Sequence, residues 1–176
     1  MSEETDGVWL AAAAKGDAAA FAALVGKYGD VLLNFFLRKG VSYADGQDLV
    51  QKTFLRVWRY RTRYTPQAKF TTFLFLLAGQ VAVDFFRAEG RRRTMTEDLA
   101  REAEQEAAVR RDPAEDAGEA VRRAVAKLPP SMRDVVELGV FQDLPYTDVA
   151  EILGIPVGTV KSRMFNALKK LKEMLG

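Results

Sequence analysis

The sequence predicts an all-α protein of two small helical domains joined by an acidic linker. Apolar residues recur at three- and four-residue steps along most of the 176 residues, as in amphipathic helices. No segment alternates apolar and polar residues between hairpin turns, as strands would. A polar, acidic stretch with few core-forming residues interrupts the helical pattern. We therefore expect a first domain at residues 1–93, the linker at 94–119 and a second domain at 120–176.

The first domain contains three well-marked helical segments. One begins after Asp17, a suitable N-cap, and stops at Gly40; its apolar residues are Phe21, Leu24, Val25, Tyr28, Leu32, Phe35 and Phe36. The next spans about residues 43–60, with Val50, Phe54, Val57 and Trp58 on one stripe. The proline in "YRTRYTPQAKF" then predicts a loop, and residues 70–87 form a long apolar helix that ends in the "GRRR" of residues 90–93.

In the second domain, two helices are joined by a tight turn. "YTDVAEILG" predicts a short helix that ends at Gly154, a residue suited to the left-handed conformation. Pro156 is tolerated in the first turn of the following helix because that position needs no backbone donor. This order of helix, glycine turn and helix is the arrangement that holds a recognition helix against a partner helix. One arc of the last helix is apolar and comprises Val160, Met164, Ala167, Leu168, Leu171 and Leu175.

Composition excludes several kinds of site. The chain has no cysteine and no histidine, so disulfides, thiolate nucleophiles, Cys/His zinc sites and histidine bases are absent. We expect no enzyme activity, no metal and no cofactor. The N-terminus is charged, unlike a secretory signal, and the most apolar run, "FLFLLAGQVAVDFF", is too short and too polar to cross a bilayer. We expect a cytoplasmic protein without membrane insertion.

Charge is distributed unevenly although the net charge is only +2. Residues 51–93 carry ten Lys or Arg against two acids, and residues 157–176 carry five against one. Between these basic blocks, residues 94–120 carry nine acids against three arginines. Two basic blocks indicate two modules that face a polyanion such as nucleic acid, although solvated helix faces produce similar runs.

Phe165 is out of place on an amphipathic helix. The polar arc of the last helix consists of Lys161, Ser162, Phe165, Asn166, Lys169 and Lys172. The lysines can reach phosphates, the serine and asparagine can bond to base edges, and the phenylalanine can press on a thymine methyl group. The alternative is that Phe165 packs against a neighbouring helix. Together with the glycine turn and the basic face, this arc favours DNA reading.

The second domain resembles region 4 of sigma factors of the extracytoplasmic-function (ECF) group, within the sigma-70 family. The resemblance rests on "DVAEILGIPVGTVKSR". In the first domain, "DGQDLVQKTFLRVWR" resembles region 2.2, and "FTTFLFLLAGQVAVDFFRAEGRRR" resembles regions 2.3 and 2.4. With "AAKGDAAAFAALVGKYGDVL", the resemblance covers nearly the whole chain outside the linker.

The resemblance implies a dissociable subunit that binds core RNA polymerase, recognises and melts promoter DNA, and has an anti-sigma factor as a further partner. It assigns polymerase binding to Asp48, Gln51, Phe54, Leu55 and Arg59. It assigns the −10 element to Phe73, Gln80, Asp84, Arg87 and Arg91, and the −35 element to Lys161, Ser162, Phe165, Asn166 and Lys169. The acidic linker resembles the connector that threads the RNA exit channel of the polymerase.

Four residues depart from the family's usual pattern: Lys52, Leu76, Gln80 and Asn166. Lys52 affects one polar contact with polymerase. Leu76 and Gln80 affect promoter melting and the −10 sequence that is recognised, and Asn166 affects the reading of guanine in the −35 element. Two other functions fit parts of the sequence. One is a stand-alone helix-turn-helix regulator, which has no need of a polymerase-binding helix. The other is a helical interaction module without DNA binding, which leaves the lysines of the last helix unexplained.

Overall fold

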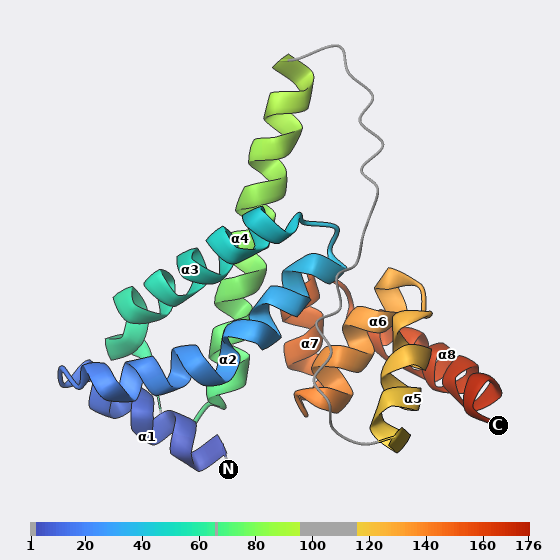
Figure 1. Cartoon of the computed structure of the whole chain (residues 1–176), viewed down its shortest axis with the longest axis horizontal. Coiled ribbons are helices and arrows are strands. Elements are labelled where there is room, and N and C mark those ends of the chain that lie inside the picture. Colours follow the sequence, from blue (N-terminus) through green and yellow to red (C-terminus); the bar gives the residue numbers. More distant parts are fainter. Residues whose placement is uncertain (1–2, 66, 96–115) are drawn as a thin grey trace. The chain divides into compact units, whose positions relative to one another are not determined.

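The computed structural model describes residues 3–65, 67–95 and 116–176, and in these ranges it contains eight α-helices and no strand (Figure 1). The expected all-α class is confirmed. The chain divides into two compact units, one before and one after residues 96–115 in the sequence. Those residues, which make up most of the predicted acidic linker, lie outside the described part of the chain. Unit 1 and unit 2 below denote residues 3–95 and 116–176.

Unit 1 is built from α1 (Glu3–Ala14), α2 (Ala18–Arg38), α3 (Tyr43–Tyr60), the short 3₁₀ helix η1 (Arg61–Arg63) and α4 (Phe70–Met95). Its caps follow from local sequence. The Asp17 side chain accepts a hydrogen bond from the N–H of Ala20 at 3.1 Å, and Ser42 caps α3 in the same way through the N–H of Asp45. Gly40 has φ of +83°, which suits glycine and ends α2 near the predicted place.

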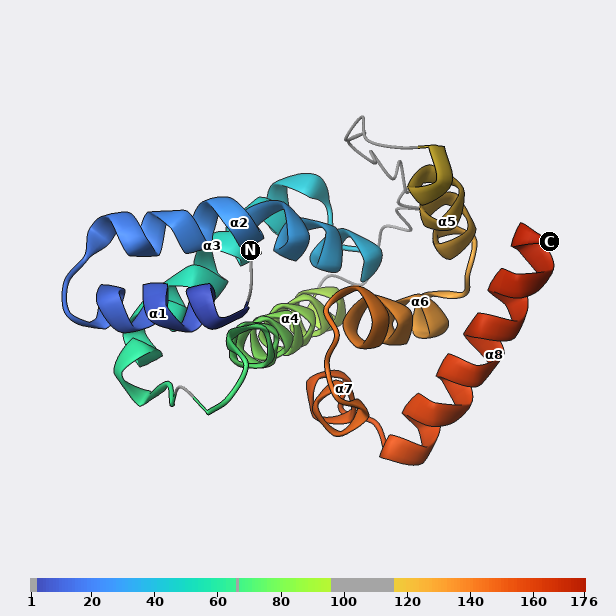
Figure 2. The same cartoon turned by 90° about the horizontal axis from the view of Figure 1, so that it is seen from below.

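The core of unit 1 is lined by apolar residues from all four α-helices. Both views show α1 running alongside α2 (Figures 1 and 2). The buried side chains include Leu10, Leu24, Leu32, Phe35, Phe36, Leu49, Phe54, Val57, Phe70, Leu74 and Phe75. The predicted stripe on α3 needs correction, since Val50 and Trp58 are only half-buried whereas Leu49 is buried. The buried arc of α3 is thus turned slightly from the predicted one.

Two helices of unit 1 are long and apolar enough, by length and composition alone, to cross a membrane: α2, and α4 from Phe70 to Arg92. Core helices of soluble proteins satisfy the same two criteria. Here the large aromatic residues Phe35, Phe36 and Phe75 are buried within the unit. Phe35 meets Phe36 and Phe75 at ring-centroid distances of 5.4 Å. These helices therefore bury their apolar faces in a protein core.

Helix α4 continues beyond its predicted end at residue 87 as far as Met95. No proline interrupts this stretch, and Gly90 is tolerated within a helix at a modest cost. Arg92 also donates a hydrogen bond to Glu89 at 3.2 Å, a helix-supporting pair three residues apart. Among the α4 residues whose burial the structure describes, up to Arg92, the last buried one is Ala82, and the end of the helix extends clear of the other helices of unit 1 (Figure 1).

Unit 2 contains α5 (Asp116–Ala126), α6 (Pro130–Val136), the π-helical turn η2 (Glu137–Phe141), α7 (Tyr146–Leu153) and α8 (Val157–Leu175). Helix α5 begins inside the stretch predicted as linker, so the unit starts before residue 120. An ion pair between Arg123 and Glu119, four residues apart at 3.7 Å, supports this early helix. The core includes Val125, Leu128, Val135, Leu138, Val149, Val160, Met164, Ala167 and Leu171.

The turn between α7 and α8 has the predicted form. Gly154 has φ of +65° and ψ of +36°, the left-handed conformation, and its N–H bonds back to α7. Pro156 is the N-cap of α8 in extended conformation, and the helix begins at Val157. Gly139 of η2 lies close to α8, because a Cβ added there would lie 2.8 Å from the Met164 methyl carbon. That methyl group is the end of a flexible side chain, which would have to move to make room for a larger residue.

Candidate nucleic-acid interface

The outward face of α8 carries all five residues predicted to contact the −35 element. Helix α8 buries Val160, Met164, Ala167 and Leu171, which recur at helical spacing. The side chains on the opposite arc are exposed: Lys161, Ser162, Phe165, Asn166 and Lys169. Figure 2 shows α8 extending from the short helix α7, with which it packs at its start. The turn and the buried arc thus hold these five side chains on one surface.

Phe165 is 71% exposed, the largest exposure among the bulky apolar residues that the structure describes. The alternative that this ring fills a gap against another helix of its own unit does not hold in this structure. The predicted apolar arc also needs correction, because Leu168 is 50% exposed and Leu175 is 46% exposed. Leu168 lies 100° around the helix from buried Ala167, which places it at the edge of the buried arc. The exposed surface of α8 is accordingly both basic and apolar.

The N-terminal turn of α8 offers backbone donors to an anion. The N–H groups of Thr159 and Val160 bond to the Pro156 carbonyl, so this turn is well formed. The N–H groups before them have no acceptor within the helix and lie at the positive end of its dipole. The Ser162 hydroxyl donates to the Thr159 carbonyl at 3.1 Å, which leaves its oxygen as an acceptor. Lys161 stands beside this turn, so a phosphate meets charge and N–H donors together.

On α4, four of the five residues predicted to contact the −10 element are exposed. Gln80, Asp84, Arg87 and Arg91 follow one another at helical spacing along the outer face. Phe73 lies at the start of the same helix and is half-buried against Tyr64, with 5.5 Å between ring centroids. Leu77, which also falls on this face by spacing, is 6% exposed and belongs to the core. The face is therefore mostly polar and cationic.

The Asp84 carboxylate is not isolated on this face. It accepts a hydrogen bond from the Arg56 guanidinium of α3, and the two side chains form an ion pair across α3 and α4. Sequence reasoning missed Arg56. A usable signal was that the basic block of residues 51–93 contains only two acids, Asp84 and Glu89. Each of them pairs with an arginine in the structure, Asp84 with Arg56 and Glu89 with Arg92.

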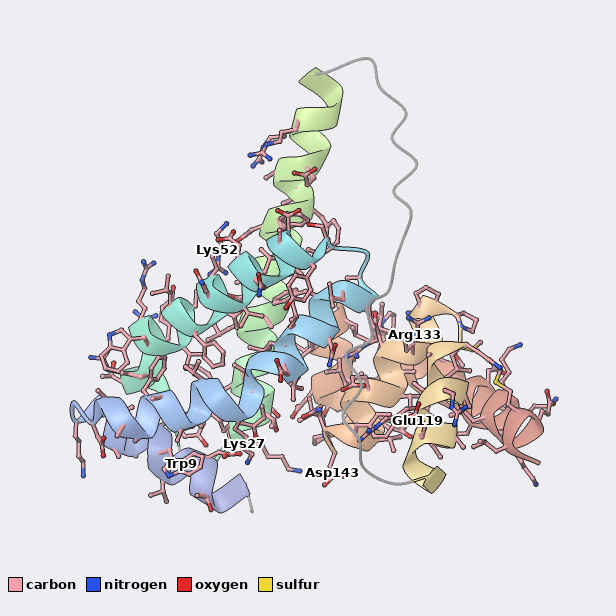
Figure 3. The ribbon with its side chains drawn as sticks, viewed as in Figure 1. Trp9, Lys27, Lys52, Glu119, Arg133 and Asp143 are labelled. Carbon is pink, nitrogen blue, oxygen red and sulfur yellow. The ribbon has the colours of Figure 1, made fainter. Side chains whose placement is uncertain are left out.

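On α3, a second exposed surface carries most of the residues predicted to bind polymerase. Asp48, Gln51, Leu55 and Arg59 are exposed, and Leu55 is 66% exposed. Lys52 lies among them and forms an ion pair with Asp48 at 2.7 Å (Figure 3 labels Lys52). Asp48 is therefore partly neutralised by a neighbour on its own helix. A single exposed leucine is common on protein surfaces, so its exposure shows that a partner can reach Leu55 and does not by itself indicate one.

Phe54 does not lie on that surface. It is 5% exposed, and its ring meets Phe21 of α2 edge-on, with 6.2 Å between centroids. Its side chain points about 100° around α3 from that of Leu55, which is enough to place Phe54 in the core and Leu55 in solvent. The predicted set is corrected here: Phe54 supports the surface from within the core, and Leu55 is the apolar residue that a partner can reach.

Nothing in the described part of the chain suggests a metal centre. Among the residues at 3–65, 67–95 and 116–176, no three acidic side chains come together as metal ligands would.

Comparisons with known proteins agree with this division into two units. The family model described as Sigma-70 region 2 matches residues 24–92, and the one described as Sigma-70, region 4 matches residues 118–171. The ECF RNA polymerase sigma-E factor of Salmonella typhimurium is 32% identical over 178 residues, which cover 95% of this chain and 93% of that protein. The RNA polymerase sigma-H factor of Pseudomonas aeruginosa is 29% identical over 188 residues, covering 99% and 96%.

Solved structures show the same fold. The sigma factor RpoE of Bartonella quintana, in complex with the anti-sigma factor NepR, matches with a TM-score of 0.63 and 23% identity. The match covers 88% of this chain and 96% of that one. CnrH, in complex with the cytosolic domain of CnrY, matches with a TM-score of 0.60 and 24% identity, covering 97% of both chains. With a region model on each unit and a relative 32% identical over nearly its full length, the chain belongs to the sigma-70 family, among the ECF RNA polymerase sigma factors.

Proposed function

We propose that this chain directs core RNA polymerase to promoters by using three surfaces, on α3, α4 and α8. Promoter-directed initiation of transcription is the function of its family. The observation that carries the residue-level proposal is the 71% exposure of Phe165 within the basic arc of α8, directly after the glycine turn. A helix-turn-helix places such an arc in the major groove of DNA.

For the −35 element, α8 supplies two kinds of contact. Lys161 and Lys169 bind phosphates and set the position of the helix on the duplex. Phe165 and Asn166 lie where they reach base edges, the ring against a thymine methyl group and the amide against a base with a free donor and acceptor. Ser162 contributes its oxygen as an acceptor, since its hydrogen is directed at the Thr159 carbonyl.

For the −10 element, the exposed face of α4 suits a single strand with its bases unstacked. Arg87 and Arg91 provide charge for the phosphates, and Gln80 provides a side-chain amide for a base. Half-buried Phe73 lies at the near end of this face. A melted strand needs such a combination of cations, stacking surface and polar groups.

For polymerase, the surface on α3 consists of Asp48, Gln51, Leu55 and Arg59. Leu55 is its apolar centre and the polar residues are its rim, which is the usual composition of a protein interface. Lys52 pairs with Asp48, so the negative charge of the Asp48 carboxylate on this surface is partly offset. The relative positions of these residues on one helix support a single docking contact.

We extend the proposal to three further properties. The titles of two solved relatives name partner complexes, RpoE with an anti-sigma factor and CnrH with the cytosolic domain of CnrY. We propose an anti-sigma factor as a partner of this chain as well. Sigma factors as a class are not enzymes, and we propose the same for this chain and a cytoplasmic location.

In-vitro transcription tests the proposal against both alternatives. Purified chain is added to core RNA polymerase with a pool of genomic promoter fragments, and the transcripts are sequenced. A sigma factor produces a defined set of start sites that require both chain and core. A stand-alone regulator binds duplex DNA tightly without core and adds no start sites. An interaction module does neither, and either of these two results would refute the proposal.

A further inference from the structure

A buried carboxylate on α1 binds two side chains of α2. Asp6 is fully buried, and the Lys27 ammonium of α2 lies 2.8 Å from each of its oxygens. The Tyr28 hydroxyl of α2 donates a further hydrogen bond to the same carboxylate. A buried charge is tolerated only when it is paired and hydrogen-bonded, so these three groups set the register of α1 on α2. Figure 3 labels Lys27 on α2 and Trp9 on the adjacent α1.

The next residue of α1, Gly7, meets the segment that precedes α4. A Cβ added at Gly7 would lie 3.2 Å from the Tyr64 hydroxyl oxygen, closer than an ordinary van der Waals contact. Glycine at this position therefore lets the hydroxyl approach the helix backbone. The same hydroxyl donates a hydrogen bond to the Ala68 carbonyl at 2.6 Å, which links Tyr64 to a residue just before α4.

Aromatic rings connect Tyr28 and Tyr64 to the first residues of α4. The rings of Tyr28 and Tyr64 both contact Phe70, the first residue of α4, at centroid distances of 5.4 and 6.4 Å. Tyr64 also contacts Phe73 at 5.5 Å. Phe70 is 1% exposed, so it is held between these rings. A side chain at position 7 that displaced the Tyr64 hydroxyl would therefore also act on Phe73, at the near end of the proposed −10 surface.

We propose that Asp6 and Gly7 are positioning residues for promoter opening: through Tyr28 and Tyr64 they set the geometry of Phe70 and Phe73 at the start of α4. Both residues lie outside residues 24–92, which the region 2 family model matches. The inference rests on the proposed function of the α4 face. It adds that the N-terminal helix belongs to the opening machinery although it carries none of the residues proposed to contact DNA.

Two glycine-to-alanine variants test this with matched chemistry. Gly7→Ala and Gly26→Ala both replace a glycine inside a helix, and both gain similar helix propensity. Only the first meets a neighbour, since a Cβ at Gly26 finds nothing within 4 Å. Tyr64→Phe then removes the hydroxyl that the new methyl group would press on while it keeps the ring and its packing.

The assay uses holoenzyme assembled on core polymerase with a promoter that the wild-type chain selects from the genomic pool. The rate of strand opening is followed by permanganate reactivity of unpaired thymines, and core affinity and thermal unfolding are measured in parallel. We expect Gly7→Ala to slow opening by about three- to tenfold relative to Gly26→Ala, with core affinity changed less than about twofold. The double variant Gly7→Ala/Tyr64→Phe should open no more slowly than Tyr64→Phe alone, because the clashing hydroxyl is gone.

Three results would overturn the inference: equal or faster opening by Gly7→Ala than by Gly26→Ala, effects of Gly7→Ala and Tyr64→Phe that simply add, or a loss of core affinity that accounts for the slower opening. A wild-type chain that selects no promoter refutes the proposed function itself and this inference with it. The two failures are therefore distinguishable.

Discussion

Replacing Phe165 by alanine separates a DNA-reading role of this ring from a packing role. Full burial of a phenylalanine side chain contributes about 1.5–3 kcal/mol to stability. Because Phe165 is 71% exposed, less than a third of its surface is covered. We therefore expect a loss of less than about 1 kcal/mol in the free energy of unfolding, partly offset by the better helix propensity of alanine. Leu171→Ala, at a site only 8% exposed, should cost about 2–5 kcal/mol.

The effect on DNA should be larger than the effect on folding. A mismatched base pair in a specific site typically costs about 1–3 kcal/mol, or about five- to 150-fold in affinity, and loss of the contact that reads one base pair should remove up to that much discrimination. Holoenzyme carrying Phe165→Ala should therefore bind the best −35 sequence and its single-base variants with more similar affinities. Lys161→Ala should instead weaken binding to all sequences evenly and reduce the salt slope by about one unit.

Competition gel shifts with a set of −35 variants measure both effects, and thermal unfolding of the free chain measures stability. Leu175→Ala is the control, since it removes an apolar side chain of 46% exposure from the last turn of the same helix. Unfolding of Phe165→Ala at a much lower temperature, with −35 preference unchanged, would refute the reasoning.

Three other changes have defined outcomes. The double variant Asp48→Ala/Gln51→Ala should lower affinity for core polymerase in a pull-down without loss of helix content, because both side chains are exposed on α3; normal core binding would count against the α3 surface. Asp84→Asn should cost less than about 1 kcal/mol in thermal unfolding, since its pair with Arg56 is partly exposed, but should change base preference at −10; an unchanged preference would leave Asp84 a purely structural role. Neutralising Glu97, Asp98, Glu102, Glu104 and Glu106, which lie outside the described residues, should strengthen binding of promoter duplex by the free chain in a gel shift. That gain should shrink as salt rises, because the Debye length falls to about 8 Å at physiological ionic strength, and tight core-independent binding by the unaltered chain would contradict it.

Features fixed by local chemistry were predictable from the sequence. Asp17 caps α2 and Gly154 adopts the left-handed conformation because each satisfies backbone groups within a few residues. The exposure of Phe165 agrees with the 3.6-residue period of α8. The apolar arc that this period predicts includes Val160, Met164 and Ala167, which are buried, and leaves Phe165 on the polar arc. These features depend on spacing along one helix and on no partner elsewhere in the chain.

Features fixed by distant partners were not predictable in the same way. Gly16, with φ of +100°, marks the end of α1 in the sequence, but the register of α1 on α2 depends on the contact of Asp6 with Lys27, 21 residues further along. Arg56 and Asp84 are 28 residues apart, and only the packing of α3 on α4 brings them together. Phe54 and Leu55 point about 100° apart around α3. The helical period alone does not fix the rotation of α3 about its axis closely enough to say which of the two side chains faces a partner.

The unequal burial of α4 has a consequence for its dynamics. The half from Phe70 to Ala82 is held by the core, so its amide hydrogens should exchange with solvent only when unit 1 opens as a whole. Beyond Ala82, residues such as Phe86, Arg87 and Arg91 are exposed, and a short helical stretch in water is only marginally stable by itself. Amides there should exchange much faster, by local fraying. One continuous helix would thus contain a rigid half and a half that a bound nucleic acid strand can order, and bound promoter should slow exchange chiefly in the second.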